Sequence, residues 1–177
     1  MLRMLDLFAG LGGASQAMRE RGWHVTTVEL EERFKPDVVA DITTYNYQGP
    51  QLDLIWASPP CTEFSRESMP WCRTGKEPSM ALVGHALRVI QEAKPRFWVI
   101  ENVRGAQRFL GPAKWVRNPV FLWGEFPDFD AKVRPWKERL SSKQTAERAK
   151  MPREISEALA KAIEGSIPYE ALGRWAL

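Results

Sequence analysis

Short apolar runs alternate with segments of helix-forming composition between Met4 and Ile100, and each run ends close to a glycine, a proline or an acidic residue. Short runs of this kind are typical of buried strands in a parallel sheet. Strands that alternate with helices form the repeating unit of α/β folds. We therefore expect a doubly wound, mostly parallel α/β sheet with helices on both faces. The predicted strands are Met4–Phe8, Val25–Val28, Asp37–Asp41, Leu52–Trp56, Phe97–Ile100 and Val120–Trp123, and the predicted helices are Ala14–Glu20, Pro78–Lys94 and a last amphipathic helix around Ile155–Ile163.

Length and composition indicate one soluble globular domain. The chain has 177 residues, of which 44% are hydrophobic and 27% charged, so it can bury a sizeable core. Cys61 and Cys72 lack the paired spacing of a structural zinc site, and no metal is expected. No apolar run is long enough for a membrane span, and the lack of a secretory leader favours a cytoplasmic location.

Charge is distributed unevenly along the chain. Acids predominate between Glu29 and Asp53, whereas bases predominate between Asp130 and Arg153. The net charge of +3 and the pI of about 9.0 permit a polyanionic partner without requiring one. The basic stretch suits phosphate groups, although a solvated surface explains that stretch equally well.

The carboxyl ends of the predicted strands carry groups suited to a nucleoside ligand. A glycine loop, Gly10–Gly13, follows the first strand, and its spacing differs from the dinucleotide-binding fingerprint, which disfavours nicotinamide and flavin cofactors. Glu29 and Asp41 end the next two strands and could accept hydrogen bonds from ribose hydroxyls and an adenine amino group. Because strand ends converge in such a sheet, these groups predict one binding crevice.

A stiff corner made by Pro59 and Pro60 follows the fourth predicted strand and presents Cys61 at the same edge. We interpret Cys61 as a catalytic nucleophile held in a fixed position. A small buried cysteine after a turn is the alternative that the corner alone leaves open. Glu101, at the end of the fifth strand, is expected to join this edge.

Three segments, in this order and spacing, resemble the C5-cytosine DNA methyltransferases. The resemblance covers Met1 to about Gly105 and implies S-adenosyl-L-methionine as the methyl donor, on a sheet of the S-adenosylmethionine-dependent methyltransferase type. The segments are Asp6–Gly13, Pro59-Pro60-Cys61 with Phe64-Ser65, and Glu101-Asn102-Val103.

The resemblance also implies a role for each residue of the site. Cys61 would add to C6 of a flipped-out cytosine, Glu101 would hydrogen-bond N3 and the exocyclic amine, and Arg117 would contact the base or its phosphate. The implied cofactor contacts are Phe8, Ala9, Gly10, Gly12, Gly13, Glu29, Leu30, Asp41, Ile42 and Pro59, and the implied substrate contacts are Ser65, Arg66 and Asn102.

Two departures from the family pattern bear on the substrate. In the segment Trp115–Gly124, which resembles the family's Gln-x-Arg-x-Arg strand, Trp115 replaces the glutamine and Pro119 the second arginine. Residues 125–149 stand where family members carry a sizeable recognition domain, and they leave little material for reading base edges. We therefore expect one catalytic domain over 1–177, comprising a core (1–124), a reduced recognition segment (125–149) and a C-terminal helix that returns to the core (150–177), with relaxed or no sequence specificity.

Three functions are compatible with these patterns. The first is a DNA cytosine-5 methyltransferase of phage or restriction–modification type, with DNA as the most favoured partner. The second is the same chemistry on RNA, single-stranded DNA or a cytosine nucleotide. The third is a cofactor-binding or catalytic subunit that needs a partner chain for target recognition. The target sequence and the oligomeric state are open at this point.

Overall fold

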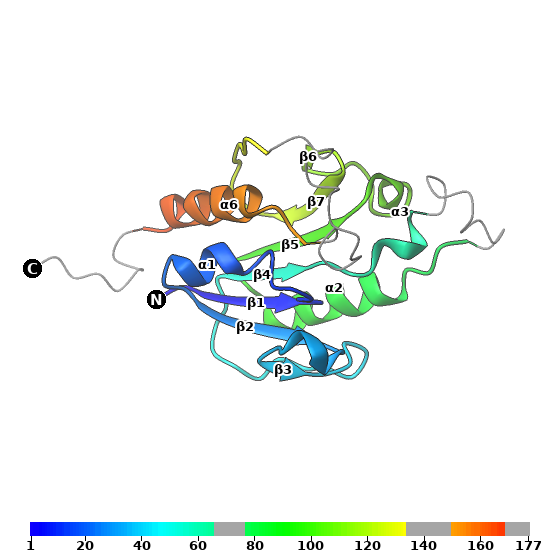
Figure 1. The fold of residues 1–177 in the computed structure, drawn as a ribbon, viewed down its shortest axis with the longest axis horizontal. Coiled ribbons are helices and arrows are strands. Elements are labelled where there is room, and N and C mark those ends of the chain that lie inside the picture. The colour runs from blue at the N-terminus through cyan, green and yellow to red at the C-terminus, as the bar shows by residue number, and fades with distance from the viewer. Residues whose placement is uncertain (66–76, 134–149, 169–177) are drawn as a thin grey trace, which may run out of the picture.

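A seven-stranded mixed sheet forms the centre of the computed structural model, which describes residues 1–65, 77–133 and 150–168 (Figure 1). The strand order is β3-β2-β1-β4-β5-β7-β6, and the first five strands in this order are parallel. β7 runs antiparallel to both of its neighbours. The predicted fold class is confirmed. The strands are β1 (Arg3–Leu7), β2 (His24–Glu29), β3 (Val38–Val39), β4 (Leu54–Ala57), β5 (Phe97–Asn102), β6 (Trp115–Arg117) and β7 (Val120–Glu125).

Helices cover both faces of the sheet. In Figure 1, α1 and α6 lie on one face and α2 lies on the other. None of the helices in the described part of the chain is both long and apolar enough to cross a lipid bilayer. The helices are α1 (Gln16–Glu20), α2 (Ala81–Ala93), α3 (Gln107–Leu110) and α6 (Arg153–Ser166), with short 3-10 turns η1 (Glu32–Phe34), η2 (Cys61–Glu63) and η4 (Arg104–Ala106).

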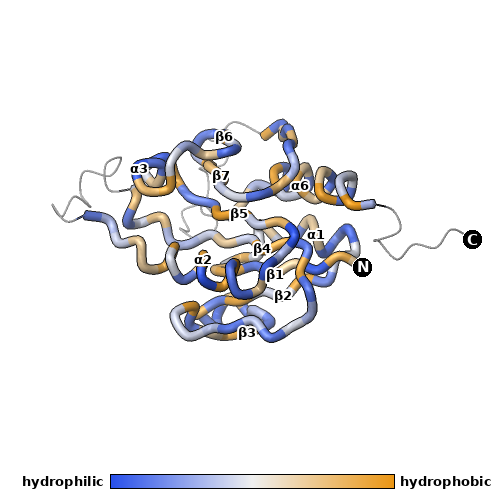
Figure 2. Tube along the Cα trace, turned by 180° about the vertical axis from the view of Figure 1, so that it is seen from behind, coloured by the Kyte–Doolittle hydropathy of each residue, from blue (hydrophilic) through white to orange (hydrophobic). Residues whose placement is uncertain are grey.

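The apolar core has two parts because successive residues of a strand point to opposite faces. Met4 and Trp56 are fully buried beneath α1 and α6, whereas Leu5 and Leu7 are fully buried on the α2 face. Hydrophobic and hydrophilic residues alternate along α6, as expected for a helix with one buried side (Figure 2). β1, β2, β4 and β5 therefore each contribute to both parts.

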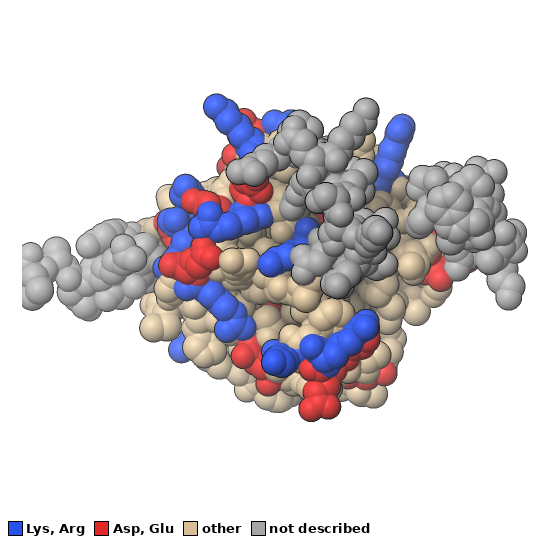
Figure 3. Space-filling view, viewed as in Figure 1, with Lys and Arg blue, Asp and Glu red and all other residues tan. Residues whose placement is uncertain are grey.

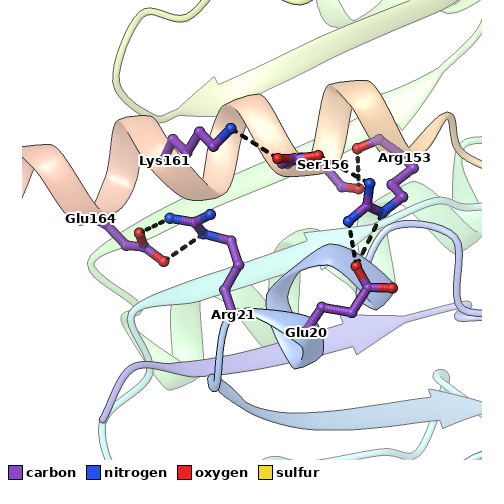
Figure 4. Close-up of polar contacts among 7 residues, drawn as sticks. Glu20, Arg21, Arg153, Ser156, Lys161 and Glu164 are labelled. Atoms are coloured by element: carbon purple, nitrogen blue, oxygen red, sulfur yellow. Dashed lines mark hydrogen bonds and ion pairs between the residues drawn. The ribbon is translucent and has the colours of Figure 1, made fainter.

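α6 packs against α1, although the two helices are far apart in the sequence. On the face shown in Figure 3, cationic and acidic side chains are interleaved over this region. Arg21 pairs with Glu164, which also accepts a hydrogen bond from the Trp23 indole at 2.9 Å, and Arg153 pairs with Glu20 (Figure 4). Exposed ion pairs contribute about 0–1 kcal/mol each. The buried apolar side of α6 therefore supplies most of the docking free energy, through Ile155, Leu159 and Ile163.

The segment Trp115–Gly124, which resembles a single strand of the family, forms a hairpin of two strands. β6 and β7 are antiparallel, with Arg117 paired to Val120 across a turn at Asn118-Pro119. Proline has no amide proton for a strand ladder, which explains why the strand is interrupted there. The predicted strand Val120–Trp123 lies within β7.

The described beginning of the segment 125–149 packs against this hairpin. Phe126 and Ala131 are buried, and the Phe129 ring stacks on the Trp115 indole with ring centroids 4.9 Å apart. The Trp115 indole also donates to the Phe129 carbonyl at 3.1 Å. Phe126, Phe129 and Ala131 thus pack into the core, whereas Asp128, Asp130 and Lys132 are exposed. Most bases of the basic stretch between Asp130 and Arg153 lie outside the described residues.

Candidate active site

The glycine loop and the Pro-Pro-Cys corner leave the sheet side by side. β1 and β4 are adjacent parallel strands, and Leu7 is paired with Ala57 at their carboxyl ends. The Ser58 amide continues the ladder by donating to the Leu7 carbonyl at 3.2 Å. The strands that follow β1 along the chain, β2 and β3, lie on one side of this pair, and the strands that follow β4 lie on the other side. Open α/β sheets bind their ligands at such a topological switch point.

Glu29, at the end of β2, holds the glycine loop. One carboxylate oxygen accepts from the Gly10 amide at 3.0 Å, and the other accepts from the Leu30 amide at 2.8 Å and the Glu31 amide at 3.3 Å. A carboxylate has about four acceptor positions, so about one is left for a ligand hydroxyl. Gly10 has a φ of 49°, which glycine adopts without strain.

Phe8 also has a left-handed backbone, with a φ of 59°. This conformation is costly for a bulky residue and occurs mainly at functional sites. Phe8 lies directly before the glycine loop, where the family resemblance implies a cofactor contact. The strained position supports a functional role for this loop.

The ends of β2 and β3 offer an apolar surface beside the Glu29 carboxylate. Glu29 is paired with Val39, and the side chains of Leu30 and Val39 are 62% and 54% exposed. The side chain of Ile42 is buried in the core, so only its backbone could reach a ligand. The Asp41 carboxylate accepts from the Thr43 amide at 2.9 Å, and this bond holds the pKa of Asp41 below its usual value. An ionised acceptor beside exposed apolar side chains is suited to an adenosine group.

The corner that carries Cys61 is held by several hydrogen bonds. The Cys61 carbonyl accepts from the amides of Phe64 at 3.0 Å and Ser65 at 2.9 Å, and from the Ser65 hydroxyl at 2.9 Å. A Cβ atom placed on Gly105 would lie 2.0 Å from the Phe64 carbonyl oxygen, so the chain after β5 passes directly against this turn. Cys61 itself carries a free, half-buried thiol.

Glu101 is the penultimate residue of β5, the strand next to β4, which leads into the cysteine corner. Ile100 is paired with Ala57, which puts Glu101 beside Ser58. Burial raises the pKa of Glu101 to about 7, and a hydrogen bond from Ser58 opposes this effect. A carboxyl group that still holds its proton near neutral pH can act as a general acid.

The comparisons with known proteins bear directly on these motifs. The model of the C-5 cytosine-specific DNA methylase family matches residues 2–109. The chain belongs to this family. The resemblance described above is thereby confirmed, and S-adenosylmethionine is the methyl donor that the family uses.

Individual relatives match the same part of the chain. A protein of Frog virus 3 (isolate Goorha), named as a probable DNA (cytosine-5)-methyltransferase, is 32% identical over 114 residues, which cover 57% of this chain and 53% of that protein. The type II methyltransferase M.HhaI of Haemophilus parahaemolyticus is 33% identical over 114 residues, covering 58% of this chain and 34% of that enzyme. The chain thus spans about half of the first relative and about a third of the second.

Among solved structures, the S. pombe Dnmt2 methyltransferase is 21% identical to this family member, with a TM-score of 0.43. The match covers 61% of this chain and 36% of that one.

Two of the expected substrate contacts are buried in this family member. Asn102 is fully buried; its side-chain amide donates to the Pro59 carbonyl at 3.1 Å, and its oxygen accepts from the Val103 amide at 2.9 Å. Ser65 is 7% exposed and bonds to the Cys61 carbonyl. In this structure the polar groups of both residues hold the cysteine corner, and substrate contact by either residue stays a prediction. Pro59 is likewise buried, and its carbonyl receives the Asn102 amide.

Arg117 lies on β6, at the edge of the sheet, with β7 between it and β5. Its guanidinium pairs with Asp130 at 2.7 Å and donates to the Ala131 carbonyl at 3.5 Å. Asp130 and Ala131, in the segment after β7, thus bond to the Arg117 guanidinium, which the family resemblance predicts to contact the cytosine base or its phosphate. A catalytic role for Arg117 stays a prediction, and Arg66 lies outside the described residues.

Two features near the glycine loop were not expected from the sequence. Asp6, in the middle of β1, is 1% exposed, and no donor among the described residues reaches its Oδ2 atom. Burial raises the pKa of Asp6 to about 7, against a hydrogen bond with Ser15 that lowers it. A cavity of about 360 Å³ lies between the loop and the α1 side, lined by Gly10, Gly12, Ser15 and Arg19 among others. Its lining includes none of Glu29, Asp41, Cys61 and Glu101, so it is separate from the strand ends.

Ser58 is the main residue of this site that sequence reasoning missed. Its hydroxyl accepts a hydrogen bond from the Trp56 indole at 2.8 Å, and its presence beside Glu101 lowers the pKa of that carboxyl group against the effect of burial. A serine between a strand and a proline is an ordinary turn residue, so the sequence alone gives it no role. The feature that could have indicated a role for Ser58 is its position: it directly follows β4, and the neighbouring strand β5 carries Glu101 near its end.

Proposed function

We propose that this protein transfers a methyl group from S-adenosylmethionine to C5 of cytosine in DNA. The observation that carries the proposal is the pairing of β4 with β5, which brings the Cys61 corner and Glu101 to one edge of the sheet. Asn102 on β5 bonds to Pro59 in that corner at 3.1 Å and so fixes one group relative to the other. A nucleophile and a general acid held on neighbouring strands suit a reaction that needs both at once.

The Cys61 sulfur, as thiolate, adds to C6 of the cytosine. The π electrons of the C5–C6 double bond shift through C4 towards N3. Glu101 donates its proton towards N3, which leaves C5 with the nucleophilic character of an enamine. C5 then takes the methyl group, which S-adenosylmethionine supplies when bound. A base then removes the C5 proton. Cys61 leaves as the C5–C6 double bond re-forms, and N3 returns its proton to Glu101, which restores the starting state of both residues.

The glycine loop and the acids of β2 and β3 are proposed to hold the cofactor. The loop backbone from Phe8 to Gly13 would line the methionine part, and the remaining acceptor position of Glu29 would bind a ribose hydroxyl. Leu30 would cover the adenine ring, with Asp41 and the Ile42 amide on its polar edge. Pro59 would line the side nearest to Cys61.

We further propose relaxed or no sequence specificity for the chain acting alone, within one catalytic domain. Residues 126–133 are packed against the β6–β7 hairpin, so they offer few free side chains for base edges. RNA, single-stranded DNA and cytosine nucleotides are the alternative substrates. A partner chain that supplies recognition is the remaining alternative.

A trapping experiment tests the proposal. The protein is mixed with labelled S-adenosylmethionine and duplex DNA containing 5-fluorocytosine, whose fluorine cannot leave as a proton does. We expect a covalent protein–DNA adduct that survives denaturation, is lost in Cys61→Ser and is kept in the matched control Cys72→Ser. Parallel reactions use single-stranded DNA, RNA and a 5-fluorocytosine nucleotide. An adduct that forms equally well in Cys61→Ser, or none on any substrate, would overturn the proposal.

A further inference from the structure

We propose that Ser58 is a positioning residue, which holds the Glu101 carboxyl so that its acidic proton faces the substrate base. This inference rests on the proposed function, in which Glu101 is the proton donor. It assigns a role to a residue that none of the family motifs described above includes. The inference follows from the placement of Ser58, from its hydrogen bond to Trp56 and from the chemistry of a carboxyl group.

The backbone places Ser58 next to Glu101. Ala57 and Ile100 are paired across two adjacent parallel strands, and each of the two residues follows one member of this pair. The Ser58 amide bonds to the Leu7 carbonyl on the other side, so the backbone at this point is fixed from β1. On β7, the residue paired with Glu101 is Leu122, so the strand positions flanking Glu101 carry no charge. The other titratable residue of the proposed catalytic pair is Cys61.

Trp56 determines the direction in which the Ser58 hydroxyl donates. Its indole is fully buried, and Nε1 donates to the Ser58 oxygen at 2.8 Å. An indole N–H can only donate, so the Ser58 oxygen must accept here, and its single proton is free for a different partner. That partner is Glu101, whose pKa the Ser58 hydrogen bond lowers, as expected of a hydroxyl donating to a carboxylate.

A carboxyl group has two oxygens, and this arrangement makes them unequal. The oxygen that accepts the Ser58 proton is less basic, so the acidic proton resides on the other oxygen. A carboxyl that is protonated on the correct oxygen can donate to N3 without first rotating. Ser58 acts through Glu101 and is therefore a positioning residue.

The test reads Glu101 directly. Carboxyl ¹³C resonances of glutamate-labelled protein are followed against pH, with the Glu101 signal assigned by its loss in Glu101→Gln. In the wild type its midpoint is expected at about pH 7. Ser58→Ala should move this midpoint upward by about one unit, because a donor to the carboxylate is lost. Ser58→Thr, which keeps the hydroxyl, should restore the wild-type midpoint. The matched control Ser166→Ala, at the end of α6, should leave it unchanged.

Kinetics complete the test. In Ser58→Ala, kcat should fall about tenfold while KM for DNA stays within about twofold, since the substrate is still bound but the proton is misdirected. A Glu101 midpoint that does not move in Ser58→Ala would overturn the inference, whatever the activity. A midpoint that moves in a protein that methylates no substrate would instead overturn the proposed function.

Discussion

Gly13 lies so close to Met151 that a Cβ atom added to Gly13 would stand 2.6 Å from the Met151 amide nitrogen and 2.9 Å from its carbonyl oxygen. The Gly13 carbonyl also accepts from the Ser156 hydroxyl, at 3.4 Å, in the first turn of α6. The glycine loop of the proposed cofactor site is thus covered by the residues that lead into the last helix. Only glycine leaves room for this approach.

Gly13→Ala should therefore separate α6 from the loop. We expect the free energy of unfolding to fall by about 2 kcal/mol, since the obstructing atoms are backbone atoms and cannot rotate away. Urea unfolding followed by circular dichroism measures the change. Gly84→Ala is the matched control: Gly84 is exposed within α2 and a Cβ there meets no atom within 4 Å. This control should raise stability by about 0.5–1 kcal/mol. Equal stability of Gly13→Ala and wild type would contradict the close contact.

Glu101→Gln should lower kcat about 100-fold or more, because glutamine can donate a hydrogen bond but cannot transfer a proton to N3. The pKa of about 7 predicts that wild-type activity falls as pH rises through 7, where Glu101 loses its proton. The variant should lack this alkaline limb. A methyl-transfer assay from pH 5 to 9 measures both effects, with Glu125→Gln at the exposed end of β7 as control. An unchanged pH profile in Glu101→Gln would assign the proton to a different group.

Asp6 should make stability depend on pH. Its pKa is about 7 in the folded protein and near 3.8 when unfolded, so between these values the unfolded chain is ionised and the folded chain is not. The contribution of Asp6 therefore favours the folded state most below about pH 4, and roughly 4 kcal/mol of this contribution is lost as pH rises to 7. Asp6→Asn should lose this part of the slope.

Chemical unfolding at a series of pH values measures this slope. The matched control is Asp128→Asn, whose side chain is 98% exposed and which should retain the wild-type pH dependence. Glu101 adds a slope of the same sign in Asp6→Asn, so the variant should show a reduced fall rather than none. A slope identical to that of the wild type would show that Asp6 is ionised in the folded protein at neutral pH.

Glu29→Gln should weaken cofactor binding about tenfold. The amide nitrogen of glutamine is a donor, and it would oppose the backbone amides that now bond to the carboxylate. Titration calorimetry with S-adenosylmethionine measures the effect. Glu31→Gln serves as control, because the Glu31 carboxylate is exposed and pairs with Arg33 at 2.7 Å. If the two variants bound the cofactor equally well, Glu29 would have no special role in the site.

The parallel part of the fold could be predicted from the sequence because each strand is a short apolar run with a polar end. β1, β2, β4 and β5 lie within two residues of the predicted ranges at each end. The ends of these runs carry Glu29, Cys61 and Glu101, and the rule that strand ends converge was sufficient to group them. The weaker pattern after Arg104 gave no comparable guidance, and the β6–β7 hairpin was missed.

The sequence gives less guidance where a polar residue bonds to the backbone. Asn102 follows Glu101 directly, and a motif match gives both residues a place at the substrate. In a strand, however, neighbouring side chains point to opposite faces, so Asn102 is directed into the core next to Pro59. Ser58 was missed for the converse reason, since its role depends on Trp56 and Glu101, and no local pattern encodes that combination.

The contact between α1 and α6 also has a consequence for protein synthesis. Arg21 and its partner Glu164 are 143 residues apart, so a ribosome completes the glycine loop and α1 long before it makes the helix that covers them. Until then, Met4, Met18 and their neighbours on that face lack the apolar surface of α6. The loop proposed to hold the cofactor therefore waits for the synthesis of α6 before it can reach its final packing.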